Sequence, residues 1–397
     1  MTRLETSTSR PAPDQRISLD GFRRVVVSLN VDESRTKNFL RELRRRGFEV
    51  LVFDQVGRGY VLSALLPFLR AVYRSDFVIC GTRFPWQIPW MLAARLLGRP
   101  CFVDCAMDIA AWPFPETRRW RRIAKMGLRS ASCMLTIKSR AYLAAKFGLN
   151  RRRVLFTESC PDPELIDKAR SAAPHFQHPD HSLLLCWSGG HHHHELERFM
   201  PTFQKLAEIV PNARLLIIAH DEKQSVVESL AYAEKAGLRD RVHVLGIIKP
   251  VEAFFATLAQ CDLWVSTLGD STLQGRQELR MEFLEAGLLG KAVIASRTPA
   301  LEQHGFADGQ EILYIDPTDP AGAAHKIARL AADPSTRQRL SDGLRSRVMK
   351  EFSLECAVDQ ILGWAASNQG RVWAPSGADA VPARERIEKN SVADNRA

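Results

Sequence analysis

Residues 276–296 read RQELRMEFLEAGLLGKAVIAS, and this stretch decides the fold. The pattern predicts a helix that ends at Gly290, because glycine commonly closes a helix in a left-handed conformation. Lys291 follows, and the next four residues, Ala-Val-Ile-Ala, form a short and continuously apolar run. Such a run is typical of a strand that is buried on both faces. The stretch therefore predicts a helix that stops and a buried strand that follows it.

Three carboxylates occur in the predicted helix: Glu278, Glu282 and Glu285. Their spacing of four and three residues places them on one stripe. A solvated acidic face is the simpler interpretation, and we favour it for Glu278 and Glu282. Glu285 lies toward the C-terminal half, where the helix dipole disfavours an anion.

For Glu285 we favour a functional interpretation, which rests on a resemblance. The run from Glu285 to Ser296 resembles the donor-site signature of GT-B glycosyltransferases of the family 4 type, the glycosyl transferases group 1. The resemblance implies an α/β protein with the GT-B fold, in which two Rossmann-like domains face each other across a cleft. It also implies that Glu285 binds the ribose hydroxyls of a nucleotide-sugar, since a carboxylate offers two acceptor oxygens.

Two positions depart from the family pattern. Ala292 stands where the family usually has proline, and Gln277 stands where many members have a glutamate that supports the sugar and the catalytic centre. Gln277 keeps the hydrogen bonding of that glutamate without its charge, and the neighbouring Glu278 is the alternative.

Length and composition predict a globular protein. The chain has 397 residues, 45% of them apolar and 25% charged, which is sufficient for two domains. No apolar run reaches the ~18 residues of a membrane span, and no signal peptide is apparent. Eight cysteines show neither a CxxC pair nor metal-ligand spacing, so we expect buried, reduced thiols in a cytoplasmic protein. A redox pair formed by Cys101 and Cys105 is the less favoured alternative.

The net charge of +10 is distributed unevenly. Residues 1–160 contain 29 Lys and Arg against 13 Asp and Glu, whereas the remainder contains 26 against 32. A basic N-terminal half is typical of proteins that meet a polyanion or an anionic membrane surface. Arginines interleave with Trp and Phe at 112–122, which suits lipid headgroups and supports a peripheral position on the inner face of the cytoplasmic membrane. No nucleic-acid recognition motif accompanies the charge, so no nucleic-acid partner is expected.

Short apolar runs alternate with helical segments, which predicts parallel sheets covered on both faces. The helical segments 61–75 and 85–98 are expected to pack on a sheet, with insertion into a membrane interface as the alternative. We expect disordered ends at 1–19 and 367–397, an N-terminal acceptor domain at 20–165, a linker at 166–181, a C-terminal nucleotide-sugar domain at 182–350 and a final helix at 351–366 that crosses back. The predicted strands are 24–29, 50–53, 77–80, 101–104, 133–136, 154–157, 183–187, 214–219, 242–245, 263–266, 292–295 and 312–315.

The strand at 183–187 leads through a glycine-containing loop into a helix predicted from about Glu195. Glycines in such a loop let backbone N–H groups approach a phosphate, and the helix N-terminus adds positive potential. Four histidines at 191–194 are interpreted as a polar loop, with one hydrogen bond to a phosphate or sugar as the alternative; a metal site is disfavoured. The family has a similar loop here, so we assign to donor binding Ser188, Gly189, Gly190 and His191.

A second loop, at 268–275, leads into the helix of the opening stretch. It follows a strand, at the edge where open α/β sheets bind ligands. Arg276 or Arg280 is a candidate for the diphosphate, because a bidentate arginine fits phosphate oxygens; pairing with Glu278 or Glu282 is the alternative. Residues 246–250 resemble the family segment whose backbone contacts the nucleobase. The donor-binding set is completed by Ile248, Lys249, Ser271, Thr272 and Gly275.

The resemblance implies transfer of a sugar from a nucleotide-sugar to a lipid-linked, saccharide or other glycoconjugate acceptor, with retention. No metal or other cofactor is expected, since helix dipoles and basic side chains stabilise the leaving diphosphate. The histidine that the family has in its N-terminal domain is missing, because no histidine precedes His175. Asp104 and Asp108 stand in its place as a base or sugar contact, or as a cap or turn residue, and together with Gln277 they are the catalytic candidates.

Other classes of protein are compatible with parts of this pattern. A catalytically inactive GT-B-like binding protein fits the Gln277 departure, and a GT-B nucleotide-sugar epimerase would use the same donor site without an acceptor. A nicotinamide-dependent oxidoreductase is disfavoured, because no GxGxxG follows either opening strand.

Overall fold

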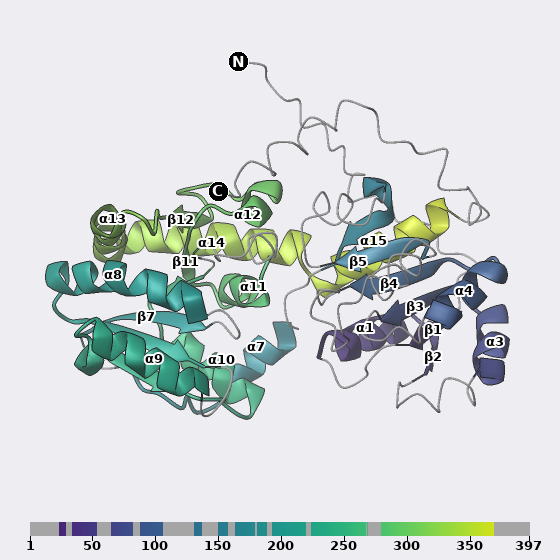
Figure 1. Cartoon of the computed structure of the whole chain (residues 1–397), viewed down its shortest axis with the longest axis horizontal. Helices are drawn as coiled ribbons and strands as arrows, with labels where there is room; N and C mark the ends of the chain where they lie inside the picture. The colour runs from purple at the N-terminus through teal and green to yellow at the C-terminus, as the bar shows by residue number, and fades with distance from the viewer. Residues whose placement is uncertain are drawn as a thin grey trace, which may run out of the picture.

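The computed structural model consists of two α/β halves (Figure 1). The chain passes from the first half to the second before α7 (Pro163–Ala169) and returns to the first half before α15 (Leu354–Ser367). The predicted disordered segment 1–19 lies outside the described residues, as do residues 369–397 of the predicted tail 367–397 and the arginine and tryptophan cluster at 112–122. Residue 367 belongs to the last helix. The structure describes residues 24–28, 34–53, 65–81, 88–105, 131–136, 150–157, 163–178, 181–188, 193–219, 224–266, 268 and 279–368.

The first half contains a parallel sheet of six strands in the order β2-β1-β3-β4-β5-β6. Successive side chains of a strand point to opposite faces, so Val25 and Val27 enter one apolar core and Val26 enters the other. Helices cover both faces, as a parallel sheet requires. The elements are β1 (Arg24–Ser28), α1 (Ser34–Arg45), β2 (Glu49–Val52), α3 (Leu65–Tyr73), β3 (Phe77–Gly81), α4 (Ile88–Leu96), β4 (Cys101–Cys105), β5 (Cys133–Thr136) and β6 (Val154–Phe156).

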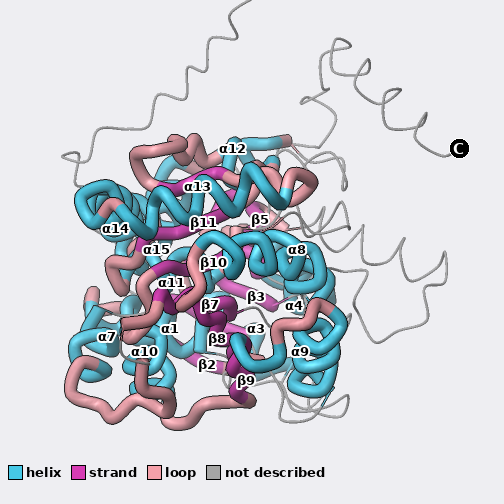
Figure 2. The backbone as a smooth tube through the Cα atoms, turned by 90° about the vertical axis from the view of Figure 1, so that its left-hand side faces the viewer, coloured by secondary structure: helices cyan, strands magenta, loops and turns pink. Residues whose placement is uncertain are grey.

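The second half contains another parallel six-stranded sheet, in the order β12-β11-β10-β7-β8-β9. Its elements are β7 (Leu183–Ser188), α8 (His193–Ile209), β8 (Ala213–Ile218), α9 (Gln224–Lys235), β9 (Val242–Leu245), α10 (Val251–Ala259), β10 (Leu263–Val265), α11 (Met281–Leu288), β11 (Ala292–Ala295), α12 (Pro299–Gln303), β12 (Ile312–Tyr314), α13 (Pro320–Ala332) and α14 (Pro334–Glu351). Figure 2 shows this sheet between two helix layers, with α7, α10, α11 and α14 on one side and α8, α9 and α13 on the other.

Each of the twelve predicted strands is present with its ends displaced by at most one residue, so the predicted α/β fold class is confirmed. The largest error in a helix concerns the opening stretch. Its helix was expected to run from residue 276, but α11 begins at Met281. Arg280 precedes it in an extended conformation, with φ −83° and ψ 146°. Gly290 has the expected left-handed conformation, with φ +69°.

The last helix, α15 (Leu354–Ser367), lies against the first sheet. Ser353 caps it by accepting a hydrogen bond from the N–H of Cys356 at 3.2 Å. At the other end, Trp364 donates from Nε1 to the carbonyl oxygen of Arg152 at 3.0 Å, and its ring packs against Phe102. The helix therefore covers a face of the first sheet with residues that come last in the described chain.

The segment expected to be a linker is anchored on the second half. It overlaps α7 (Pro163–Ala169), whose Ile166 is buried in the core beside α10. Proline is compatible with the first turn of a helix, which explains why Pro163 does not prevent one here. Further along, Nε2 of His178 lies 3.0 Å from Oδ2 of Asp262, which also accepts a hydrogen bond from the N–H of Leu184 at 2.8 Å.

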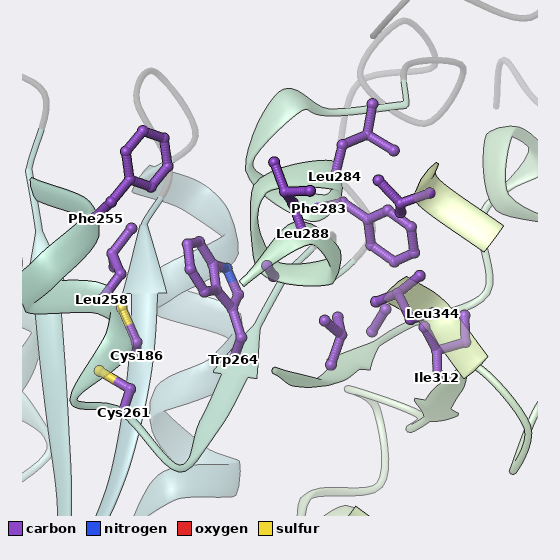
Figure 3. Packing of buried hydrophobic residues seen from close by; sticks show 14 of the residues in the cluster. Cys186, Phe255, Leu258, Cys261, Trp264, Phe283, Leu284, Leu288, Ile312 and Leu344 are labelled. Atoms are coloured by element: carbon purple, nitrogen blue, oxygen red, sulfur yellow. The ribbon is translucent and has the colours of Figure 1, made fainter. Parts of the chain in front are cut away.

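Helices α11 and α14 approach closely at Gly287. A Cβ atom added to Gly287 would lie 2.7 Å from Cγ2 of Val348 and 3.0 Å from Cγ of Leu344. Both of these side chains are fully buried. Figure 3 shows Phe283, Leu284 and Leu288 of α11 in the same apolar cluster as Leu344 of α14. The absence of a side chain at residue 287 thus sets the distance between the two helices.

We expect the Gly287→Val variant to lose about 2 kcal/mol of unfolding free energy, which is typical of an overpacked core. Gly287→Ala gains up to ~1 kcal/mol in helix propensity and so loses less. Combining Gly287→Ala with Val348→Ala should recover part of the loss, because the shorter side chain leaves room for the new methyl group. Urea denaturation of the single and double variants measures this coupling. Strictly additive effects would contradict the close approach.

Candidate functional site

The order of strands reverses between β7 and β10 in the second sheet. From β7 the chain proceeds to β8 and β9 on one side, and β10, β11 and β12 lie on the other. Val265 of β10 pairs with Trp187 of β7, so the next residues, Ser266 and Ser188, stand side by side at the carboxyl edge. Open α/β sheets bind ligands outside the carboxyl ends of the strands at such a reversal. This edge is therefore the candidate site.

Ser188 is the member of the predicted phosphate loop that the structure describes. It is the last residue of β7 and is partly exposed. Helix α8 begins at His193, two residues before the predicted start, and is 17 residues long. The N-terminus of a long helix thus lies close behind the carboxyl end of β7, where it favours an anion.

Two hydroxyl residues at this edge are absent from the predicted set. Ser266 and Ser296 directly follow β10 and β11, and they are only 3% and 5% exposed. The N–H of Ser266 donates to the carbonyl oxygen of Ile294 at 2.9 Å, which ties the two strand ends together. A serine immediately after a continuous apolar strand is the sequence signal that identifies both.

Arg280 and Glu285 belong to the cap and the body of α11, the first helix described after β10. Arg280 occupies the N-cap position of this helix and is only 6% exposed. Glu285 is partly exposed and lies between the buried residues Leu284 and Ala286. Glu278, the first member of the predicted acidic stripe, lies outside the described residues. Glu282 and Glu285 do share the helix, three residues apart.

The predicted nucleobase segment follows β9. Ile248 is buried in the core, whereas Ile247 and Lys249 are exposed. Pro250 then occupies the N-cap position of α10. The segment thus lies just beyond the carboxyl end of β9, and a contact of its backbone with a nucleobase stays a prediction.

The first sheet has its own reversal of strand order, between β1 and β3. Asp104 lies one strand away from this reversal, on β4. It is paired with Gly81, the last residue of β3. Its side chain is 9% exposed. A carboxylate thus lies near the carboxyl edge of the half expected to bind the acceptor.

Several predicted site residues lie outside the described part of the chain. The catalytic candidates among them are Asp108 and Gln277. The donor-binding candidates among them are Gly189, Gly190, His191, Ser271, Thr272, Gly275 and Arg276. Among the residues that the structure does describe, no three His, Cys, Asp or Glu side chains form a group that could hold a metal ion.

A separate titratable cluster contains Lys291, Cys186 and Cys261. Nζ of Lys291 donates to the carbonyl oxygens of Ala259 and Cys261 at 2.6 and 2.7 Å, and burial lowers the pKa of the lysine. The two thiols lie next to each other in Figure 3. Burial and the hydrogen bond between them raise the pKa of Cys186. A thiol that stays protonated is a poor nucleophile, so this cluster has a structural role.

The redox alternative for Cys101 and Cys105 is wrong. These residues lie at the two ends of β4, and at ~3.3 Å per residue about 13 Å of strand separates them. The thiol of Cys101 instead contacts that of Cys80, with 4.0 Å between the sulfur atoms. The expected burial of thiols is confirmed for five of the six cysteines whose side chains the structure describes, and Cys356 is partly exposed.

Residues 182–333 match the family model described as Glycosyl transferases group 1. The match runs from β7 through α13, and it includes Ser188, Arg280 and Glu285. A search of curated proteins with the sequence finds no match.

Solved structures are similar over nearly the whole described chain. The glycosyltransferase from Rickettsia africae ESF-5 aligns with a TM-score of 0.66 at 11% identity, covering 87% of this chain and 98% of the other. Anabaena Alr3699/HepE in complex with UDP aligns with a TM-score of 0.61 at 15% identity, covering 87% and 100%. Sucrose-phosphate synthase from Thermosynechococcus elongatus aligns with a TM-score of 0.59 at 15% identity, covering 87% and 98%.

Identities this low establish the fold alone, and the family model adds the class of the second half. No helix in the described residues combines the length and hydropathy that a bilayer span needs. The protein therefore has the GT-B fold, its second half is a glycosyl transferases group 1 domain, and the chain is a glycosyltransferase of the EC 2.4 type.

Proposed function

We propose that the protein transfers a sugar from a nucleotide-sugar to a lipid-linked, saccharide or other glycoconjugate acceptor, with retention of configuration. The observation that carries the proposal is the strand reversal at Ser188 and Ser266, inside the segment that matches the group 1 model. The position of the reversal agrees with a donor site at the carboxyl edge of the second sheet.

In this proposal the diphosphate of the donor binds between the starts of α8 and α11. The N-terminal ends of both helices carry partial positive charge, and Arg280 adds a guanidinium at the cap of α11. These groups favour the diphosphate most when negative charge develops on it as the glycosidic bond breaks. Gly189, Gly190 and His191, with Ser271, Thr272, Gly275 and Arg276, complete this part of the proposed site.

The rest of the donor has two proposed contacts. The ribose hydroxyls bind the carboxylate of Glu285, and the nucleobase lies along the backbone at Ile248, with Lys249 at its edge. The sugar then points toward the first half, where Asp104 and Asp108 are the proposed base or sugar contacts and Gln277 supports the sugar. A front-face retaining reaction needs no separate base, so Asp104 need not remove a proton from the acceptor hydroxyl.

The proposed setting is the synthesis of a glycolipid or polysaccharide in the cytoplasm, at the inner face of the cytoplasmic membrane. The basic character of residues 1–160 supports contact with an anionic surface. UDP is the first nucleotide to test, because a structure similar to this one is a complex with UDP and another is a complex with UDP-glucose.

The test is a thermal-shift series with UDP, GDP, ADP, TDP and CMP, with and without magnesium. A ligand that binds only the folded state raises the melting temperature. At a ligand concentration of 100 Kd, the free energy of unfolding rises by about 2.7 kcal/mol. We expect one nucleoside diphosphate to shift the melting temperature, with no need for magnesium. No shift with any of the five would remove the support for a donor-binding transferase.

The Gln277 departure favours a second candidate, a GT-B protein that binds the donor without transferring the sugar. Incubation with the matching nucleotide-sugar separates the candidates. Release of the nucleoside diphosphate indicates a transferase, isomerisation of the sugar indicates an epimerase, and binding without either reaction indicates an inactive binding protein.

A further inference from the structure

We propose that α3 and α4 together form the surface through which the protein docks on an anionic phospholipid bilayer. Ten large apolar side chains are exposed in the described part of the chain, and five of them belong to this helix pair and the turn that follows it. Tyr73 and Leu96 are the most exposed of all, at 68% and 77%. The five residues are Leu66, Tyr73, Leu92, Leu96 and Leu97.

The two helices form one continuous surface. The rings of Phe68 in α3 and Trp90 in α4 pack beneath it, with centroids 4.0 Å apart. At the C-terminal ends, Nη2 of Arg99 donates to the carbonyl oxygen of Tyr73 at 2.8 Å. Figure 1 shows α3 and α4 at the end of the molecule opposite the second half. Among the described elements, those of the second half lie away from α3 and α4 in this view.

The exposed side chains are aligned along each helix. Residues 66, 70 and 73 follow the spacing of four and three that makes one stripe of α3, and residues 92 and 96 make one stripe of α4. On α3 this stripe reads Leu, Arg, Tyr, and Arg74 is exposed beside it. Cationic and apolar side chains therefore alternate on the same face.

The charge of this surface is complementary to anionic lipid. Residues 55–103 contain six arginines, no lysine and a single acidic residue, Asp76. Oδ2 of Asp76 accepts a hydrogen bond from the N–H of Arg24 at 2.8 Å, so this carboxylate is engaged at the start of β1. A planar guanidinium binds phosphate oxygens with two hydrogen bonds, and arginine clusters concentrate at anionic bilayers.

The composition of the two helices favours a lipid surface over a protein partner. Residues 65–74 and 88–99 contain no Ser, Thr, Asn, Gln, Asp, Glu or His. A specific protein interface carries roughly one hydrogen bond per 100–200 Å², and these helices offer few uncharged groups to make them. Leucine, tyrosine and arginine are the side chains that suit the boundary between headgroups and acyl chains.

The docking surface would bring a glycosyltransferase to a lipid-linked acceptor, and this biological role rests on the proposed function. Helix α3 precedes β3 and runs back along the sheet, so its first turn, with Leu66, lies at the carboxyl edge. The proposed docking surface thus begins at the edge where the acceptor is expected. Vesicle binding itself requires neither donor nor acceptor.

The experiment is co-sedimentation of the full chain with phosphatidylglycerol–phosphatidylcholine vesicles and with pure phosphatidylcholine vesicles. We expect binding to the anionic vesicles that weakens at high salt, since each arginine near such a surface contributes about a fivefold gain in binding. The Arg70→Gln/Arg74→Gln variant should therefore bind about 25-fold more weakly at low salt. The Leu92→Ser/Leu96→Ser variant should bind at least tenfold more weakly, in proportion to the lost apolar contact.

The matched control is Val227→Ser/Met349→Ser, which removes two exposed apolar side chains from α9 and α14 in the other half. We expect it to bind vesicles like the wild type, and all variants to keep the wild-type melting temperature because the substituted side chains are exposed. Three results would overturn the inference: no binding to anionic vesicles, equal binding by the α3–α4 variants, or a dimer in solution that Leu92→Ser/Leu96→Ser converts to a monomer. A chain that binds vesicles but no nucleoside diphosphate would overturn the proposed function and leave the docking surface intact.

Discussion

The Glu285→Ala variant is expected to bind the nucleotide-sugar, and the matching nucleoside diphosphate, about 100-fold more weakly than the wild type. In the proposed site the carboxylate accepts hydrogen bonds from two ribose hydroxyls. A hydrogen bond to a charged group is worth roughly 1.5–3 kcal/mol. Two of them together correspond to a factor of about 100 or more in the dissociation constant.

The structure explains why this substitution should leave the fold intact. Glu285 is partly exposed, and the neighbours that hold α11 in the core are Leu284 and Ala286. The carbonyl oxygen of Glu285 accepts the hydrogen bond from the N–H of Leu289 at 2.9 Å, and alanine preserves this backbone contact. Alanine also has the highest helix propensity. A loss of affinity would therefore report on the carboxylate itself.

Glu282→Ala is the matched control, because Glu282 is also partly exposed and lies one turn earlier on the same helix. Isothermal titration with the nucleoside diphosphate measures both variants. We expect near wild-type affinity for Glu282→Ala. Equal affinities of the Glu285→Ala variant and the wild type would remove Glu285 from the donor site, whatever the activity of the protein.

The Ile361→Asp variant is expected to lose at least ~4 kcal/mol of stability in the first half, enough to unfold it. Ile361 is 1% exposed and belongs to the cluster in which α15 packs on β1, β3 and β4. The change forfeits about 1.5–3 kcal/mol of apolar burial. It also places a carboxyl group among Val25, Phe77 and Phe102, where burial of an unpaired polar group costs several kcal/mol more.

This substitution in α15 should destabilise strands more than 200 residues earlier in the sequence. The reason is that α15, the only described element after α14, covers the first sheet. Arg46, which directly follows α1, donates to the carbonyl oxygen of Glu355 at 3.1 Å and pairs with Asp359, so α15 is also held by charge near its start. Loss of α15 would expose the apolar face formed by β1 and β3. We expect the variant to aggregate or to bind dyes that recognise exposed apolar surface.

Gln360→Asp is the control for this effect, since Gln360 is the preceding residue and is exposed. It introduces the same charge one position away, on the solvent side of α15. We expect it to change the free energy of unfolding by no more than about 0.5 kcal/mol. Similar midpoints for Ile361→Asp and Gln360→Asp would show that α15 does not stabilise the first sheet.

The strands could be predicted to within one residue because their signal is local. Runs such as 183–187 and 292–295 are continuously apolar, and in an alternating α/β chain such runs are buried on both faces of a parallel sheet. The end of the helix at Gly290 could be predicted for a similar reason, because a left-handed conformation favours glycine in any context. The resemblance carried by residues 285–296 then pointed to the same fold as the strand order.

The start of α11 and the role of the linker could not be read in the same way. Residues 276–280 have the composition of a helix, but Arg280 is extended at the N-cap of α11. Residues 158–181 contain four prolines, yet α7 packs on α10 and His178 contacts Asp262, 84 positions further along the chain. Contacts between distant segments decide both cases, and no local pattern encodes them.

By itself, the sequence determined the alternation of strands and helices, the class of the second half and the identity of Glu285 as a candidate, because each depends on neighbours within about a dozen residues. Only the tertiary structure decided that Ser188 and Ser266 meet at one edge, that α15 closes the first sheet, and that the exposed residues of α3 and α4 form one surface. Strand order and helix packing are set by the burial of apolar faces from the whole chain, which is a property of the fold and not of any segment.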